Sequence, residues 1–222
     1  MATFINASYR PVLIPTFLAT AEYNPSGGTD VISQAHTINA ATTFLVIWLL
    51  SHDNNAFTTS GWSYGGVAMT TCGTRAVSAS GFVIAEAFYI ASPASGSQTI
   101  AITNSENVRA QAIVVQEFKD VGASPVANYN SNTSASATSL GVAVTAGGPG
   151  LLLAGFAMRT QVTSPTIDTT TIDQTGVFNG SLGDVSWSAG HSTFAGSNIT
   201  ATGSHSSSAV EMAGAAFRLV GT

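Results

Sequence analysis

Short apolar runs, each about the length of one β-strand, recur along the chain and are separated by segments rich in Gly, Pro, Ser and Asn. No stretch keeps the 3.6-residue period of an amphipathic helix. The strongest run, Thr42–Ser51, is apolar from Phe44 to Leu50 without polar alternation, which predicts a strand buried on both faces. It is far shorter than the roughly 20 residues that a membrane-spanning helix needs. The pattern predicts an all-β protein.

The same pattern predicts the remaining strands. They are expected at Val12–Ala19, Asp30–Ile38, Trp62–Tyr64, Val67–Cys72, Phe82–Ile90, Gln98–Thr103, Ala110–Phe118, Leu140–Thr145, Leu151–Arg159, Val185–Trp187 and Ser208–Val220. Gly65 and Gly66 mark a tight turn between two of them, because glycine tolerates positive φ. The segment Ala127–Ser139 has few apolar residues and is predicted to be an extended surface loop.

A weak internal echo links two of the predicted strands. Ala110–Gly122 and Ala209–Gly221 align without gaps and share Ala, Phe, Val and Gly at matching positions, with a basic residue after the Phe. One interpretation is a pair of equivalent strands in a duplicated sandwich. The other is two unrelated core strands of similar composition. The sequence leaves both open.

Composition narrows the class of protein further. Only 8% of the residues are charged, against a usual share near one quarter, while 45% are hydrophobic. The formal net charge is −5 and the single lysine is Lys119, so no basic patch is available for nucleic acid or an anionic membrane surface. A chain of 222 residues can bury one substantial core. We therefore expect an N-terminal arm or first strand at residues 1–20 and one antiparallel β-sandwich over residues 21–222.

The N-terminal residues, MATFINASYRPVLIPTFLAT, lack the basic start, long apolar segment and cleavage site of a signal peptide. Arg10, Pro11 and Pro15 interrupt what apolar character is present. We expect the chain to begin at or near Met1 and to be made in a cytoplasm. The lone cysteine, Cys72, excludes an intrachain disulfide, and we expect it to be a small buried side chain in a strand.

Catalytic and metal-binding patterns are scarce. The acidic residues are scattered, no spacing nominates the carboxylate pair of a glycosidase, and no G-x-S-x-G is present. Glu86, Glu117 and Glu211 fall within predicted strands, where an outward position or pairing with arginine is the expected role. The histidines are not spaced as a zinc motif; they are His36, His52, His191 and His205. We therefore predict no catalytic residues and no cofactor.

Two segments carry weaker candidates for binding. Asp53 and Asn55 follow the core strand in an oxygen-rich loop and could ligate Ca²⁺, although Asp and Asn also favour turns for conformational reasons. Phe178, Trp187 and Phe194 lie in a Thr-, Gly- and Ser-rich span. Their rings could stack on sugars from exposed loops, or could alternate inward and fill the core.

A recognisable order of motifs runs from about Ile32 to Gly122. It comprises His36-Thr37-Ile38, FLVIWLLS, Trp62-Ser63-Tyr64-Gly65-Gly66 with Met69-Thr70, then Tyr89-Ile90, Pro93, Gly96, Gln98-Thr99-Ile100 and Phe118…Val121. This order resembles a widespread β-sandwich module of phage virion proteins and secreted bacterial surface proteins. The resemblance implies a jelly-roll-like sandwich and no enzyme. Two departures are Trp48, where smaller aliphatic residues are usual, and Lys119-Asp120 before Val121 in place of a Gly.

The function expected from these observations is that of a bacteriophage virion structural protein on the particle surface, most simply a capsid decoration or head-fibre-type component. Its partners would be other virion proteins and copies of itself, with no nucleic acid and no membrane. The partner-binding candidates lie in the N-terminal arm; they are Phe4, Tyr9, Val12, Ile14 and Phe17. The alternative is a carbohydrate-binding or host-receptor-binding adhesive module, which would use Phe178, Trp187 and Phe194.

Overall fold

The computed structural model describes residues 13–25, 29–145, 147–168, 171–180 and 183–222. The strands of the N-terminal half are β1 (Thr16–Tyr23), β2 (Thr29–Thr37), β3 (Phe44–His52), β4 (Thr59–Tyr64), β5 (Val67–Ala68), β6 (Thr70–Thr71), β7 (Ala76–Val77), β8 (Val83–Ala91), β9 (Ser97–Val108) and β10 (Ala110–Lys119). Those of the C-terminal half are β11 (Val121–Ala137), β12 (Ser139–Val144), β13 (Gly150–Arg159), β14 (Thr166–Ile167), β15 (Thr171–Gly180), β16 (Gly183–Phe194), β17 (Ile199–Ser204) and β18 (Val210–Gly221). The prediction of an all-β fold is confirmed.

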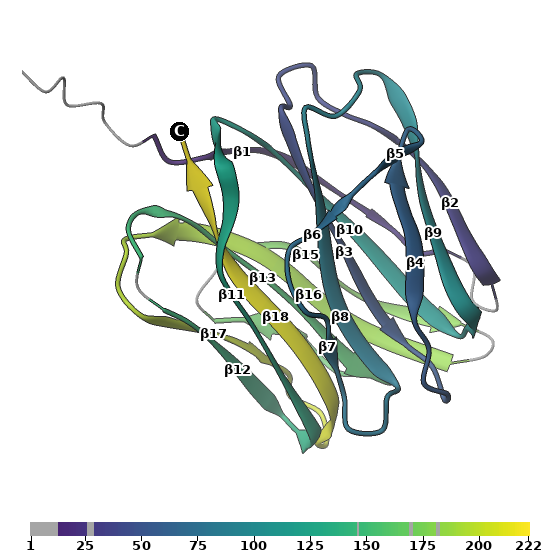
Figure 1. Cartoon of the computed structure of the whole chain (residues 1–222). Coiled ribbons are helices and arrows are strands. Elements are labelled where there is room, and N and C mark those ends of the chain that lie inside the picture. The colour runs from purple at the N-terminus through teal and green to yellow at the C-terminus, as the bar shows by residue number, and fades with distance from the viewer. Residues whose placement is uncertain (1–12, 26–28, 146, 169–170, 181–182) are drawn as a thin grey trace, which may run out of the picture.

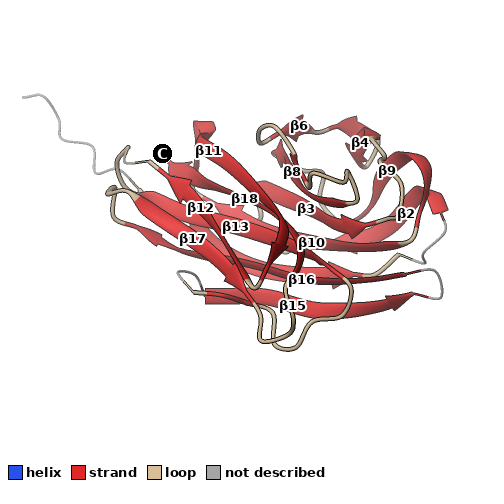
Figure 2. Ribbon diagram, turned by 90° about the horizontal axis from the view of Figure 1, so that it is seen from below, coloured by secondary structure: helices blue, strands red, loops and turns tan. Residues whose placement is uncertain are grey.

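Four antiparallel sheets are stacked on one another (Figure 1, Figure 2). The N-terminal half supplies an outer sheet in the order β2-β9-β4-β5 and an inner sheet in the order β1-β10-β3-β8-β6, with β7 also paired to β8. The C-terminal half supplies an inner sheet in the order β11-β18-β13-β16-β15 and an outer sheet in the order β12-β17-β14. The sequence predicted one sandwich over residues 21–222, whereas the structure has two, one in each half.

The two halves share one strand order. The run β1-β10-β3-β8 of the first inner sheet corresponds to β11-β18-β13-β16 of the second, and β2-β9-β4 corresponds to β12-β17-β14. With β5 beside β4, the N-terminal half divides eight antiparallel strands between β1-β10-β3-β8 and β2-β9-β4-β5, which is a jelly-roll-like sandwich. The C-terminal half departs in β15, which extends its inner sheet beside β16. The internal echo falls on β10 and β18, which hold the same place in each half, so the duplicated-sandwich interpretation is supported.

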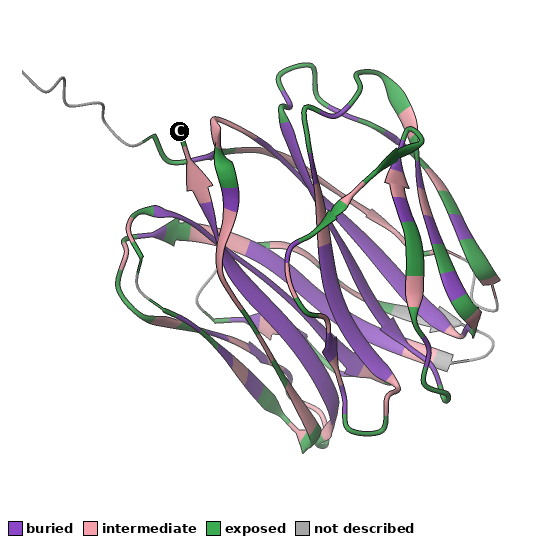
Figure 3. Ribbon diagram, viewed as in Figure 1, coloured by how far each residue is buried: buried purple, intermediate pink, exposed green. Residues whose placement is uncertain are grey.

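Three apolar layers fill the spaces between the sheets. Along β3, Val46, Trp48 and Leu50 face the C-terminal half. The intervening Leu45, Ile47 and Leu49 face the outer sheet of their own half. Every residue of β3 is consequently buried, as the continuous apolar run predicts, and the same purple burial extends along the central strands in Figure 3. The outer strand β2 instead alternates between buried and exposed positions.

Trp48 lies at the centre of the contact between the halves. Its ring stacks on Phe217 of β18 with centroids 5.6 Å apart, and its indole N–H donates to Oε1 of Gln116 at 2.8 Å. Gly155 of β13 faces the ring so closely that a Cβ at this position would lie 2.6 Å from the ring carbon Cε3. The facing glycine therefore makes room for an aromatic side chain where the resembling module uses a smaller residue.

Replacing Gly155 with alanine is expected to lower the free energy of unfolding by about 1–3 kcal/mol, because the new Cβ overpacks the Trp48 ring. Urea unfolding measures the change. The double variant Gly155→Ala/Trp48→Leu serves as the control: the loss caused by the alanine should be smaller when the ring is absent. Equal losses in both backgrounds would contradict the proposed contact.

The segment Ala127–Ser139 is not a loop, and the prediction was wrong. Most of it belongs to β11, which pairs with β18. Its asparagines bridge to the edge strand of the outer sheet. The side-chain amides of Asn128, Asn130 and Asn132 donate to the carbonyls of Thr145, Ala143 and Gly141 at 3.0, 2.9 and 2.8 Å. Every second residue here is an asparagine instead of an apolar residue. The strand therefore lacks the apolar pattern from which the other strands were predicted.

Removing these amides is expected to loosen the edge of the C-terminal sandwich. The double variant Asn130→Ala/Asn132→Ala should lose about 1–3 kcal/mol of unfolding free energy, since each bond contributes on the order of 0.5–1.5 kcal/mol. Asn55→Ala, at an exposed position, provides the control. Hydrogen exchange at β12 should accelerate in the double variant, and unchanged exchange would contradict the bridging role.

Several strand boundaries differ from expectation. The first strand begins at Thr16 and extends to Tyr23, so the expected division at residue 20 falls inside β1. The sequence also missed β14, β15 and β17, whose Thr-, Gly- and Ser-rich stretches carry few apolar residues. Cys72 is buried, as expected, although it lies just after β6 and not in a strand, and burial raises the pKa of its thiol. No helix in the described ranges is long and apolar enough to span a membrane.

Candidate functional site

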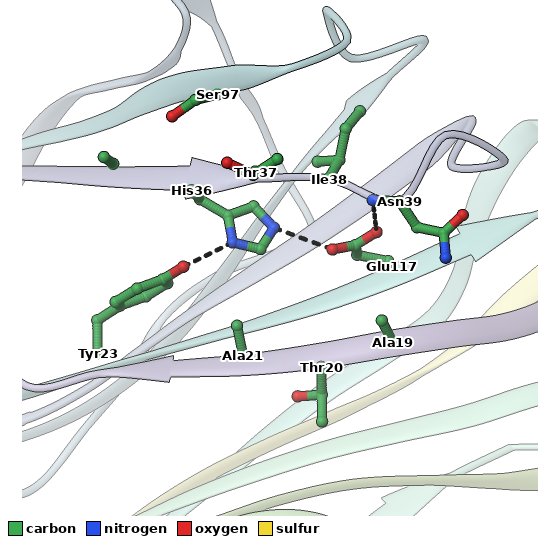
Figure 4. Close-up of a pocket in the computed structure, with 11 residues that line it drawn as sticks. Ala19, Thr20, Ala21, Tyr23, His36, Thr37, Ile38, Asn39, Ser97 and Glu117 are labelled. Carbon is green, nitrogen blue, oxygen red and sulfur yellow. Dashed lines mark hydrogen bonds and ion pairs between the residues drawn. The ribbon is translucent and has the colours of Figure 1, made fainter.

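A surface pocket of about 490 Å³ lies at the mouth of the N-terminal sandwich, between the edge strands β1 and β2 (Figure 4). Small side chains line it on both strands, including Ala19 and Ala21 of β1 and Ala35 of β2. The other lining residues are Thr20, Tyr23, His36, Thr37, Ile38, Asn39, Ser97 and Glu117. We call this feature the β1/β2 mouth.

A chain of hydrogen bonds crosses the β1/β2 mouth. The Tyr23 hydroxyl lies 2.8 Å from Nδ1 of His36, and Nε2 of His36 lies 3.0 Å from Oε1 of Glu117. The other carboxylate oxygen of Glu117 accepts from the backbone N–H of Asn39 at 2.8 Å and from the hydroxyl of Thr42 at 2.5 Å. The chain therefore joins β1, β2 and β10, with Tyr23 reaching across the mouth to His36 (Figure 4).

The partners determine the protonation of this chain. A carboxylate only accepts, so Nε2 of His36 carries the hydrogen and Nδ1 accepts from the Tyr23 hydroxyl. Burial lowers the pKa of His36, although the nearby Glu117 carboxylate opposes that shift. Burial, and then the charge of Glu117, raises the pKa of Tyr23. The same two causes, in that order, with a further contribution from Tyr23, raise the pKa of Tyr64 to about 12. At neutral pH both tyrosines are therefore uncharged.

This arrangement gives the polar side chains at the β1/β2 mouth partners within the protein. Both oxygens of Glu117 and both ring nitrogens of His36 already have partners. Tyr23 is a protonated hydroxyl at neutral pH and donates to Nδ1 of His36. The chain holds the strands at the mouth in place, and hydroxyl, amide and small apolar groups line the pocket. His36 thus has the hydrogen-bonded packing role expected from the sequence, and Glu117 pairs with it instead of with an arginine.

Acidification should weaken the fold through His36. Its pKa lies below the ordinary value of 6.5 when folded, so the unfolded state binds more protons as pH falls through that value, and stability is lost. The free energy of unfolding should therefore fall between pH 7.5 and 5.5, and less steeply in His36→Gln. Burial also lowers the pKa of His52, so His52 makes the protein less stable at lower pH in both the wild type and the variant. Burial raises the pKa of Glu86, so Glu86 makes both proteins more stable at lower pH. An identical pH slope in the variant would contradict this role.

The predicted arm residues divide into two groups. Phe4, Tyr9 and Val12 lie outside the described residues. Ile14 is 39% exposed and remains available to a partner. Phe17 instead stacks on His191 at 4.0 Å and meets Phe118 edge-on at 5.7 Å. Its ring is partly buried between the two halves, so the contacts that it makes in the structure lie within the chain.

The loop predicted to bind calcium already uses its carboxylate within the protein. The Asp53 side chain is 3% exposed, and its Oδ1 lies 3.3 Å from Nε of Arg109 and accepts from the Asn54 backbone N–H at 2.6 Å. Asn55 is exposed. The turn interpretation therefore accounts for this loop. In the described ranges, His, Cys, Asp and Glu side chains form no group of three or more that could hold a metal ion.

The sugar-binding interpretation of the aromatic residues is also corrected. Trp187 and Phe194 are 1% and 2% exposed, respectively, because their strand β16 turns them into the core, so neither ring can stack on a sugar in solution. The side chain of Phe178 lies outside the described residues. Gly176 of β15 lies over the Trp187 ring, where a Cβ would be 2.5 Å from Cζ2.

Each of the remaining histidines bonds to a different partner within the chain. His52 bonds to the Asp184 carbonyl at 2.9 Å, His191 to the Asp173 carboxylate at 2.7 Å and His205 to the Ala137 carbonyl at 3.2 Å. The other buried glutamates are also paired. Glu211 accepts from Nη1 of Arg159 at 2.9 Å, as the sequence led us to expect, and Glu86 accepts from Thr59 at 2.7 Å.

Comparisons with protein-family models, with curated proteins and with solved structures each found no match for this chain.

Proposed function

We propose that this protein is a non-enzymatic structural protein of a bacteriophage virion, made in the host cytoplasm and displayed on the particle surface as a capsid decoration or head-fibre-type component. The observation that carries the proposal is the stacking of two jelly-roll-like sandwiches into one four-sheet block. Jelly rolls are a recurrent architecture of viral capsid proteins and of lectins.

The state of the ionisable groups supports the non-enzymatic part of the proposal. Glu117, Glu211, Asp53 and Asp173 each bond to a histidine, an arginine or a backbone group within the chain. Such pairing uses these carboxylates to hold strands together, so a structural role accounts for each of them.

The composition supports a role in assembly with copies of itself and other virion proteins. A surface with few charges loses little electrostatic solvation when it is covered, and charged residues are depleted at the centres of protein interfaces. Nucleic acid and membranes are poor partners for the same chain, because six Lys and Arg residues in 222 provide no basic patch.

The adhesive alternative has less support. Two of its three proposed sugar-binding rings, Trp187 and Phe194, are buried. What remains in its favour is the use of jelly rolls by lectins and the pocket at the β1/β2 mouth.

Association with particles tests the proposal. Purified protein is mixed with phage shells stripped of surface proteins, and both are sedimented together. We expect the full chain to sediment with the shells, and a variant lacking residues 1–12 to bind at least tenfold more weakly. The deletion ends before Leu13, whose backbone N–H bonds to the Thr222 carbonyl at 2.8 Å, and so leaves β1 intact.

The truncated variant must retain the thermal unfolding midpoint of the full chain for this comparison to hold. Protein that stays in the supernatant at every concentration would refute the virion role. A glycan array would then test the adhesive alternative directly.

A further inference from the structure

The two sandwiches also differ at the mouth between their first and second strands. In the C-terminal half, β11 and β12 are bridged by the amides of Asn130 and Asn132, which bond to the carbonyls of Ala143 and Gly141. In the N-terminal half, the same place is the β1/β2 mouth, an open pocket.

The register of the inner sheets shows which residues of β1 correspond to the bridging asparagines of β11. Asn130 and Asn132 pair with Ala216 and Gly214 of β18, while Ala19 and Ala21 pair with Glu117 and Val115 of β10. When β10 and β18 are aligned by their internal echo, Glu117 coincides with Ala216 and Val115 with Gly214. The alanines of β1 therefore occupy the positions of the bridging asparagines of β11. The missing amides account for the open mouth.

An open mouth leaves the edge of β2 accessible. β2 pairs with β9 on one side and with no described strand on the other. On that side the Ala35 carbonyl accepts from the side-chain amide of Gln34 at 3.0 Å, as the Ala143 carbonyl accepts from Asn130. A second hollow lies along the other end of β2, and Val31 is 53% exposed there. Free strand edges of this kind are templates for an added strand.

We propose that the edge of β2, above Ala19 and Ala21, accepts the N-terminal segment of a second copy of this chain as an added β-strand. The alanines leave the space that the asparagines fill in the other half. Backbone N–H groups of the incoming strand would donate to the outward carbonyls of β2, as the asparagine amides donate to those of β12.

The N-terminal segment has the length and composition for this role. Its 12 residues reach roughly 40 Å when extended, and the 9 residues of β2 span about 30 Å. Residues 1–10 contain no proline, so every backbone N–H can pair, and Thr3, Phe4, Ile5 and Tyr9 favour strands.

The N-terminal segment that pairs with β2 comes more readily from a second copy than from the same chain. Leu13 is bonded through its backbone N–H to Thr222, so residues 1–12 join the rest of the protein beside its C-terminus. That point is the end of β1 away from Tyr23 and the mouth. A segment from the same chain would have to reverse direction at Leu13–Pro15, whereas a neighbouring copy can approach β2 directly.

Light scattering and sedimentation equilibrium of the full chain test this inference. Wild-type mass should rise with concentration, and an excess of synthetic peptide of residues 1–12 should return it to the monomer mass. Ala19→Asn/Ala21→Asn, which rebuilds the amides of the C-terminal half, should weaken self-association at least tenfold. Ala91→Asn/Ala135→Asn, at exposed strand positions away from the mouth, should associate as the wild type does.

Hydrogen exchange provides a readout that does not depend on any variant folding: β2 amides should exchange more slowly in the assembled wild type than after peptide competition. A wild-type monomer at all concentrations would overturn the inference, as would assembly that Ala19→Asn/Ala21→Asn leaves intact. The inference deepens the proposed function by naming a contact between copies. The inference and the proposed function can be refuted independently, because this test uses purified protein alone and the shell test uses phage particles.

Discussion

The face-to-face packing of the two inner sheets is the interaction on which the rest of the structure depends. Trp48 crosses this layer to stack on Phe217 and is accommodated by the bare backbone of Gly155. Because β3, β10, β13 and β18 are covered on both faces, almost all their side chains must be buried. Separate sandwiches would each expose an apolar inner sheet to water, which makes the four-sheet block a single cooperative unit.

Once the inner sheets are stacked, the chain must protect the open edges of its outer sheets. The C-terminal half does so with side-chain amides, since Asn130 and Asn132 cap the carbonyls of β12. The N-terminal half uses the longer chain of Tyr23, His36 and Glu117, which spans its mouth without filling it. One architecture thus carries a closed edge and an open one, and the open edge is where the geometry supports an encounter with another chain.

The apolar strands and their burial could be predicted from local pattern, because the hydrophobic effect acts on every residue of a run. The prediction failed at Ala127–Ser139, where polarity was taken for irregular backbone although β11 pairs along most of that segment. It was incomplete at Trp187 and Phe194, since Ser neighbours and loop-like composition do not reveal which way a ring points. At the candidate site the sequence singled out His36 and Glu117 separately, and nothing in the spacing connected them to each other or to Tyr23.

By itself, the sequence determined an all-β chain, a strand at Thr42–Ser51 buried on both faces, and a nearly uncharged surface. These properties follow from the kind of side chain at each position and from its immediate neighbours. Only the tertiary structure decided that the sandwich is doubled, and that Glu117, which is 81 residues from His36, bonds to it across the mouth. Such contacts depend on which strands close against one another over long distances, and one sequence's local periodicity does not encode that choice.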